Sequence, residues 1–317
     1  MQKLSIGHKK LIMNNTPLVS ILMNCFNGDK HLREAIDSVI NQTYQNWELI
    51  FWDNQSTDRS KEIFDSYNDP RLKYFLANCH TDLGKARGLA LKKIKGELIC
   101  FLDCDDLYSK HKLKIQVSFM QEEKFLMSYS SVDIVNHYGK IIRSLEVKNS
   151  SGYMLSSLLK KYEINMQTVM LRSELLQYSW CNFDPRLTYS PDYDLFLQIA
   201  SKFPVGVIGD TLVQYRIVDN SLSSQKLGVV SREMKITLDK IFDNDKKLTK
   251  NNRKAFIYAY QKLNYYDAIF NISKSHYQTA LRNIYPIRFV SFYFFALYLM
   301  ILTMVPKNLI LKILRRA

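Results

Sequence analysis

Short apolar runs alternate with longer segments of helical periodicity between Leu18 and Leu102, and this alternation constrains the fold more than any other feature of the chain. Four of the runs have the length and composition of β-strands. The segments between them are long enough for crossover helices, which parallel strands require. The pattern therefore predicts an α/β fold in which helices flank a mostly parallel sheet.

The limits of the expected elements follow from the ends of these runs. Strands are expected at residues 18–24, 47–52, 72–76 and 97–102. Helices are expected between them at residues 30–41, 59–67 and 84–94. Residues 107–225 continue with further helices and strands, including an amphipathic helix at 192–201 and a strand at 212–217, and should complete the domain.

The net charge of +14 is distributed unevenly along the chain. Residues 226–317 carry 17 Lys and Arg against 5 Asp and Glu, whereas residues 1–225 carry 27 against 25. The sheet-forming part is therefore almost neutral, which argues against a nucleic-acid-binding protein. We predict an α/β domain at 1–225 and a helical, basic C-terminal region at 226–317, with the boundary near Leu222 to Leu227.

The five cysteines are an odd set without paired C-x-x-C spacing, so neither a zinc site nor a disulfide framework is indicated. The N-terminus lacks the continuous apolar stretch and the small-residue cleavage site of a secretory signal. These two observations together lead us to expect a cytoplasmic protein.

Polar clusters follow three of the four expected strands. They occupy residues 24–27, 53–58 and 103–106. Ligands of open α/β sheets bind outside the carboxyl ends of the strands, so these clusters should meet at one edge of the sheet. That edge is where we expect the functional site.

Asp103, Asp105 and Asp106 stand close together after an apolar strand, and three such carboxylates repel one another unless a cation or hydrogen bonds compensate them. Mg²⁺ or Mn²⁺ prefers a few carboxylate oxygens together with phosphate oxygens, so the cluster suits a ligand that contains a diphosphate. Alternatively, one Asp caps the following helix and the others are solvated.

Three further side chains lie near the same edge. Asp53 could accept a hydrogen bond from a ring N–H of a nucleobase, or it could belong to a turn that caps the next helix. Lys85 and Arg87 open a helix, where cations and the helix N-terminus can together hold phosphate oxygens. Solvated surface charge is the alternative for this pair.

Asp192 and Asp194 lie two residues apart at the start of a predicted helix, so their side chains should diverge. One carboxylate could cap the helix while the other faces a cleft. A carboxylate in a cleft could take a proton from an attacking hydroxyl as a general base.

The C-terminal region contains an apolar stretch, residues 287–305, in which Arg288 is the only charged residue. The part after Arg288 has 17 residues, at the short limit for a bilayer core of about 30 Å. Residues 308–316 follow with a basic amphipathic pattern that favours anionic lipid. We expect peripheral attachment to a membrane surface, and a buried helix packed on the α/β domain is the alternative.

The motifs taken together resemble glycosyltransferase family 2, the inverting enzymes of the GT-A fold, over residues 17 to about 223. Residues 17–27 resemble the family's opening strand, residues 35–44 its first helix and residues 47–58 its uridine-binding strand. The segment 84–87 resembles the diphosphate-contacting part, and residues 96–106 resemble the strand with the metal-binding D-x-D motif.

This resemblance implies nucleotide-binding roles for Asn27, Asp53, Arg87 and Asp103, with Asp53 on the uracil of a UDP-sugar and Arg87 on its diphosphate. Asp103 would lie near the ribose or the metal. Further members of the site would be Asp106, Lys85, Asp194, Arg216 and Ser221, the last two in the motif that closes the acceptor side.

The same resemblance implies that Asp105 binds Mg²⁺ or Mn²⁺ and that Asp192 is the catalytic base. A sugar would pass with inversion from the nucleotide-sugar to a glycan or lipid-linked acceptor, at the cytoplasmic face of a membrane, in cell-surface polysaccharide or glycoconjugate synthesis.

Two departures from the family pattern leave alternatives open. Pro191 precedes the base in place of an acidic residue, and Val218 stands where His is common. A non-catalytic membrane-associated scaffold with a degenerate fold is therefore one alternative. A sugar nucleotidyltransferase is another, although the Gly-rich phosphate loop expected after its first strand is missing.

Overall fold

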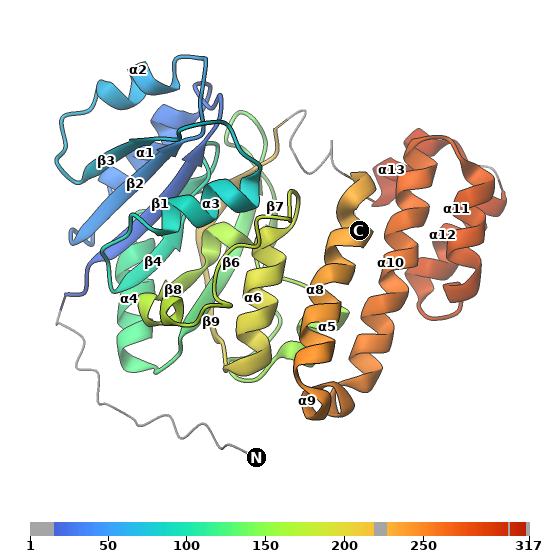
Figure 1. The fold of residues 1–317 in the computed structure, drawn as a ribbon. Coiled ribbons are helices and arrows are strands. Elements are labelled where there is room, and N and C mark those ends of the chain that lie inside the picture. Colours follow the sequence, from blue (N-terminus) through green and yellow to red (C-terminus); the bar gives the residue numbers. More distant parts are fainter. Residues whose placement is uncertain (1–15, 219–226, 304, 315–317) are drawn as a thin grey trace.

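The structure is a computed structural model that describes residues 16–218, 227–303 and 305–314 (Figure 1). Its strands are β1 Val19–Cys25, β2 Trp47–Asp53, β3 Leu72–Leu76, β4 Leu98–Phe101, β5 Leu107–Tyr108, β6 Met127–Val135, β7 Ile141–Leu145, β8 Met170–Arg172 and β9 Gly206–Arg216. They form one sheet in the order β3-β2-β1-β4-β8-β6-β9-β5, with β7 paired to β6. The predicted α/β class is confirmed.

The helices of the described ranges lie between and after these strands. The first eight are α1 Leu32–Ile40, α2 Ser60–Asp65, α3 Leu83–Leu91, α4 Lys112–Glu122, α5 Leu155–Lys160, η1 Met166–Thr168, η2 Ser173–Gln177 and α6 Pro191–Lys202. The C-terminal ones are η3 Leu227–Val229, α8 Val230–Asn244, α9 Lys246–Asn251, α10 Arg253–Ser273, α11 Tyr277–Ile284, η4 Tyr285–Ile287, α12 Phe292–Leu302 and α13 Lys307–Leu314.

Strands β1 to β4 form the predicted parallel part of the sheet. Cys25 pairs with Asp53 in register, and Asp53 pairs with Leu76, so the carboxyl ends of β1, β2 and β3 are level. The four strands predicted from the apolar runs are all present. Their alignment brings the loops that follow them to one edge, as expected for this sheet type.

The later part of the sheet is mixed rather than parallel. Strand β8 runs antiparallel to both β4 and β6, and β9 runs parallel to β6 but antiparallel to β5. The strand predicted at 212–217 is the end of the longer β9. Gly206, Gly209 and Asp210 disfavour strand formation and interrupt the apolar pattern, which concealed its beginning.

Strands β1, β2 and β4 are buried on both faces, which explains why they are almost continuously apolar. Ile21 and Phe51 point to the face covered by α1 and α4, whereas Leu22 and Phe101 point to the face covered by α3 and α6. Alternate residues of each strand thus contribute to separate cores.

Helix α8 and the first half of α10 belong to the core on the α3 and α6 side. Val230, Leu238, Phe256 and Leu263 are buried together with residues of the sheet and of α6. Figure 1 shows α6 between the sheet and α8, with α11 and α12 on the far side of α10. The predicted boundary at 222–227 falls almost entirely outside the described residues.

The apolar stretch 287–305 contains one short helix, α12. Ser291 starts it by accepting a hydrogen bond from the Phe294 N–H at 3.3 Å, and Pro306 follows soon after its end. Its 11 residues extend about 17 Å, well short of a bilayer core of about 30 Å. Among the residues that the structure describes, no helix is both long and apolar enough to cross a membrane.

Candidate active site

Asp53 ends β2 at the carboxyl edge of the sheet. Its side chain is buried, and both carboxylate oxygens accept hydrogen bonds from the protein. One carboxylate oxygen accepts from the Ser56 N–H at 2.7 Å and the other accepts from the Tyr74 hydroxyl at 2.6 Å. The residue is only 1% exposed. The turn that the sequence suggested is therefore present, and these bonds fix the orientation of the carboxylate.

The loop after β1 is bonded to the loop after β2. The Asn27 side-chain oxygen accepts from the Thr57 N–H at 2.8 Å, and the Asn27 N–H donates to the Ser56 hydroxyl at 3.0 Å. A positive φ of 54° at Asn27 lets the chain turn there, which Asn tolerates better than most residues. The two loops therefore form one surface at the sheet edge.

Arg87 connects side chains that are far apart in the sequence. Its Nη2 donates to the two carboxylate oxygens of Asp103 at 3.1 and 3.2 Å, and its Nη1 lies 3.9 Å from Asp192 Oδ1. The Arg87 residue is 5% exposed, and its Nε has no partner among the described residues. A buried arginine with a free donor between two partly exposed carboxylates is suited to bind an anion.

Two glycines of α3 explain how Arg87 reaches this position. A Cβ on Gly84 would lie 2.4 Å from the Asp184 carbonyl oxygen and 2.6 Å from that of Leu187. A Cβ on Gly88 would lie 3.2 Å from Asn182 Oδ1. Helix α3 therefore packs directly on the loop that precedes α6, and this contact brings Arg87 close to Asp192.

Gln167 is part of the site but was missed from the sequence. Its amide nitrogen donates to Asp103 Oδ2 at 2.7 Å, and its oxygen accepts from the Asp103 N–H at 3.1 Å. Gln167 is buried in η1, and the nearby Asn165 side chain accepts from its N–H. Asn165 as a cap predicts a turn at η1. No pattern in the neighbouring sequence indicates that this turn contacts Asp103.

Asp105 and Asp106 lie in different environments. Burial, and then the charge of Asp103, raises the pKa of Asp105 to about 6. Asp106 is fully buried, which raises its pKa well above the usual range, and its Oδ1 accepts from the Arg216 N–H at 2.7 Å. Asp106 therefore ties the end of β9 to the loop after β4.

Arg216 is fully engaged by the protein. Its Nε donates to the Asp105 carbonyl oxygen at 2.9 Å, its Nη1 to that of His137 at 2.9 Å, and its Nη2 to Glu34 Oε2 at 2.8 Å. Glu34 was not anticipated, since it stands on the exposed side of α1. Arg216 thus holds the D-x-D loop in place.

Asp192 and Asp194 diverge as expected from their spacing. Asp192 lies in the first turn of α6 with its side chain 25% exposed, and burial raises its pKa while Arg87 opposes the rise. Asp194 is fully buried and accepts from Thr237 and Lys240 of α8 at 3.0 and 2.8 Å. Pro191 occupies the first helical position, where proline is readily accepted.

Two predicted residues remain, Lys85 and Ser221, and only Lys85 lies within the described residues. Lys85 is exposed on α3, although it stands only two positions from Arg87. Ser221 lies outside the described residues, so its place in the site stays a prediction.

The carboxylates fit a divalent cation of the hard type. The described ranges contain no group of three His, Cys, Asp or Glu side chains arranged to hold a metal. Asp105 nevertheless carries a charge that burial and Asp103 both disfavour, which a cation would compensate. Mg²⁺ takes few protein carboxylates when phosphate oxygens supply its other ligands, so Asp105 together with Asp103 would supply the protein oxygens of such a site.

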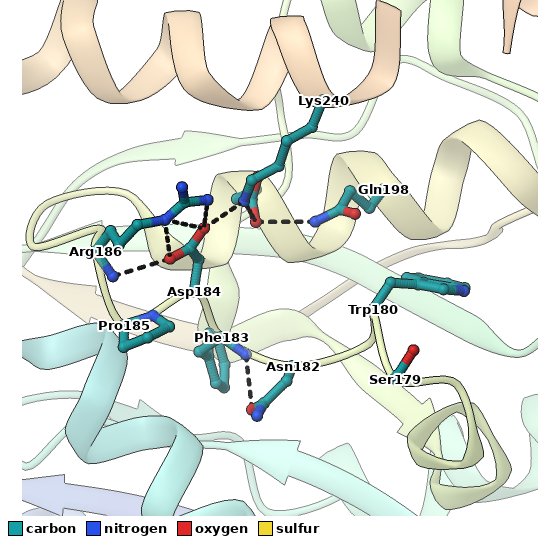
Figure 2. A pocket seen from close by; sticks show the side chains of 10 residues that line it. Ser179, Trp180, Asn182, Phe183, Asp184, Pro185, Arg186, Gln198 and Lys240 are labelled. Atoms are coloured by element: carbon teal, nitrogen blue, oxygen red, sulfur yellow. Dashed lines mark hydrogen bonds and ion pairs between the residues drawn. The ribbon is translucent and has the colours of Figure 1, made fainter. Parts of the chain in front are cut away.

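An open pocket of about 440 Å³ is lined by the loop that precedes α6 together with residues of α6 and α8 (Figure 2). Figure 2 shows Arg186 and Lys240 converging on Asp184 there, while Phe183 and Asn182 continue toward α3. These charged groups are already paired with one another. Arg87, Asp103 and Asp192 are not among the residues that line this pocket.

An α/β sheet with acidic side chains and a buried arginine at its carboxyl edge is typical of enzymes that act on phosphate-containing ligands. The Glycosyl transferase family 2 profile matches residues 20–173. The glucosyltransferase WfgD of Escherichia coli, named as acting from UDP-Glc on α-D-GlcNAc-diphosphoundecaprenol, is 31% identical over 224 residues, which are 70% of this chain and 86% of WfgD. This chain belongs to glycosyltransferase family 2.

Other relatives differ in length from this chain. An uncharacterized glycosyltransferase of Rickettsia felis is 34% identical over 209 residues, which are 66% of this chain but only 34% of the Rickettsia protein. This chain thus spans about a third of that relative.

Two solved structures share the fold. Residues 1–349 of Staphylococcus aureus TarS in complex with UDP-GlcNAc have a TM-score of 0.61 at 21% identity, covering 71% of this chain and 66% of that fragment. The mannosyltransferase PcManGT from Pyrobaculum calidifontis, in complex with GDP-Man and Mn²⁺, has a TM-score of 0.61 at 14% identity, covering 92% and 86%. The predicted GT-A fold is confirmed.

Proposed function

We propose that this protein transfers a sugar from a UDP-sugar donor to a glycan or lipid-linked acceptor in cell-surface polysaccharide synthesis. The observation that carries the proposal is the position of Arg87 between Asp103 and Asp192. The substrates named for WfgD and the UDP-GlcNAc bound to TarS support a UDP-sugar donor.

The donor side of the site consists of Asp53, Asn27, Arg87, Asp103 and Asp105. Arg87 has an unused Nε donor that can bind a diphosphate oxygen. The fixed carboxylate of Asp53 can accept from the ring N–H of uracil. Asp105 with Asp103 would hold Mg²⁺ or Mn²⁺, which when bound stabilises the negative charge on the leaving diphosphate. The Mn²⁺ in PcManGT supports a divalent metal.

Asp192 is the proposed general base. Its carboxylate is partly exposed beside Arg87, and burial raises its pKa, which makes it a better proton acceptor than an ordinary Asp. It takes the proton from the acceptor hydroxyl while that oxygen attacks the anomeric carbon. Attack from the side opposite the diphosphate inverts the configuration. Because the base must be ionised, activity should fall as the pH decreases through this raised pKa.

The first experiment measures UDP binding by thermal shift, with and without Mn²⁺, for wild type and Asp105→Ala. UDP at about 100 times its dissociation constant adds about 2.7 kcal/mol of stability. We expect a Mn²⁺-dependent rise that Asp105→Ala abolishes. No rise with UDP, GDP or dTDP would instead favour the non-catalytic scaffold.

Turnover is then measured with UDP-glucose and GlcNAc-diphosphoundecaprenol, and next with other UDP-sugars. Asp192→Asn should lower kcat by about 10²- to 10⁴-fold, the usual contribution of a general base, while the UDP thermal shift persists. Wild-type turnover by this variant would refute the assignment of Asp192.

We further propose that the protein works at the cytoplasmic face of a membrane, attached through α12 and the residues before it. Phe289, Phe292 and Tyr293 are 76%, 79% and 62% exposed on this part of the surface. The Arg288 guanidinium carbon lies 3.7 Å from the Tyr285 ring centroid. Exposed aromatic rings with adjacent cations are typical of surfaces that enter the interface of an anionic membrane. A lipid-linked acceptor would be available there.

A further inference from the structure

Glu233 of α8 is a fully buried carboxylate whose hydrogen bonds all go to one short loop. Its Oε1 accepts from the Thr188 N–H and hydroxyl at 2.8 and 2.9 Å. Its Oε2 accepts from the N–H groups of Tyr189 and Ser190 at 3.0 and 2.9 Å and from the Ser190 hydroxyl at 3.3 Å. Three consecutive backbone N–H groups therefore converge on one side chain.

The loop that Glu233 holds leads directly into the helix of the proposed base. Ser190 is the N-cap of α6; its side chain makes no capping bond to that helix, and its hydroxyl donates to Glu233. Asp192 comes two residues later. The direction in which α6 begins, and with it the position of the Asp192 carboxylate beside Arg87, is therefore fixed by a residue of another helix.

Helix α8 also holds α6 beyond Asp192. Thr237 and Lys240 donate to the carboxylate of Asp194 at 3.0 and 2.8 Å. Positions 233, 237 and 240 are separated by four and three residues, so they share one face of α8. Contacts to α8 therefore hold the chain both before Asp192, at residues 188–190, and after it, at Asp194.

We propose that Glu233 is a positioning residue that sets the location of Asp192 for proton transfer, an inference that rests on the proposed function. A charged acceptor forms stronger hydrogen bonds to N–H groups than a neutral one, so the carboxylate holds the loop more firmly than an amide could. A displacement of a reacting group by about 1 Å can lower a rate by about 10²-fold.

The test compares Glu233→Gln with the control Asp239→Asn. The control removes a carboxylate from the same helix, where Asp239 accepts from Lys235 and Tyr260 away from the loop. We expect Glu233→Gln to lower kcat by about 10- to 100-fold, with the donor KM and the UDP thermal shift nearly unchanged. Amide hydrogen exchange should accelerate at residues 188–194. Asp239→Asn should change none of these quantities.

A double variant separates positioning from general destabilisation. In the Asp192→Asn background the base is absent, so adding Glu233→Gln should not lower kcat further. Multiplicative losses in the double variant, or wild-type kcat in Glu233→Gln, would overturn the proposal. Glu233→Asp should recover part of the lost kcat because it restores the carboxylate.

Failure of the base assignment and failure of Glu233→Gln to fold can each be distinguished from failure of the proposal for Glu233. If Asp192→Asn retains full turnover, the base assignment fails whatever Glu233→Gln does. If Glu233→Gln does not fold, Thr188→Val and Ser190→Ala, which remove hydroxyl donors to Glu233, replace it in the same comparison. An unchanged kcat in both of these variants, with unchanged exchange at 188–194, would then overturn the proposal.

Discussion

Asp184 illustrates how single residues join the loop before α6 to α8. Its carboxylate accepts from Arg186 at 2.6 Å and lies 2.7 Å from the Lys240 ammonium. Its carbonyl oxygen is the atom that approaches Gly84 of α3. The hydrogen bonds of Arg186, followed by those of Lys240, hold the pKa of Asp184 well below its usual range. One residue therefore links α3, the loop and α8.

This pairing predicts a pH dependence of stability. The pKa of Asp184 is lowered in the folded state, so its contribution is complete above the unfolded pKa of about 4 and is lost as the pH falls through the folded pKa. Asp184→Asn should lower the Tm at pH 7 by about 2 °C, from about 1.5 kcal/mol for a charge-assisted hydrogen bond and an unfolding entropy of about 2.1 cal/mol/K per residue.

The measurement is thermal unfolding of wild type and Asp184→Asn from pH 7 to pH 3.5. The difference in Tm between the two proteins should shrink below about pH 4, where the unfolded carboxylate becomes protonated. A difference that stays constant over the whole range would contradict the ionic origin of the stabilisation.

Among the helices, α12 has one buried face and one exposed face. Phe294, Leu297 and Ile301 are buried against α10 and α11, whereas Phe292 and Leu302 are exposed. An apolar helix that packs through only one of its faces leaves the other apolar face exposed. Exposed apolar surfaces of this kind mark sites that bind another protein or a membrane. The stretch is thus partly buried, against α10 and α11 rather than on the α/β domain, and its exposed face is the part through which we propose membrane attachment.

The exposed face of α12 predicts binding to anionic membranes. The double variant Phe289→Ser, Phe292→Ser should weaken binding to phosphatidylglycerol-containing vesicles by at least about tenfold, because less apolar area is buried. Co-flotation with vesicles measures this effect. Tyr153→Ser, which removes an equally exposed ring from a distant part of the chain, is the control. Equal flotation of all three proteins would refute membrane attachment through α12.

At the scale of the whole molecule, the C-terminal helices complete the core of the α/β part. Val230, Leu238, Ile241 and Phe256 are buried in the same cluster as Leu197 of α6. Helices α11 to α13 instead form a separate core with the second half of α10. The packing therefore suggests that residues 1–225 depend on α8 and α10, while α12 and α13 are more separable.

This division predicts different results for two truncations. A fragment of residues 1–225 should not fold, because each lost buried side chain costs about 1.5–3 kcal/mol and several losses exceed a stability of about 5–15 kcal/mol. A fragment of residues 1–288 should fold and keep the UDP thermal shift. Soluble expression and thermal unfolding distinguish them. A folded fragment 1–225 that binds UDP would contradict the shared core.

The sequence predicted much of the fold because its signals are local. Apolar runs and the helical segments between them specify β1 to β4 and α1 to α3 through the periodicity of neighbouring residues. The polar residues at the strand ends, including Asp53 and Asp103, then follow from the rule that places ligands at the carboxyl edge.

Gln167 and Glu233 could not be found in this way. Each is a single polar residue in an unremarkable segment, and its partner lies far along the chain, 64 residues away for Gln167 and 43 to 45 for Glu233. No periodicity connects such positions. The mixed order of the later strands was hidden for the same reason, since β8 inserts between β4 and β6.

By itself, the sequence determined the α/β class, the strand ends that carry the polar clusters and the basic C-terminal region, because each depends on short-range patterns of polarity and charge. Only the tertiary structure decided that Arg87 lies between Asp103 and Asp192, and that α8 holds the start of α6. Those contacts depend on close packing of α3, α6 and α8 on one side of the sheet, as at Gly84, and packing is a property of the assembled chain.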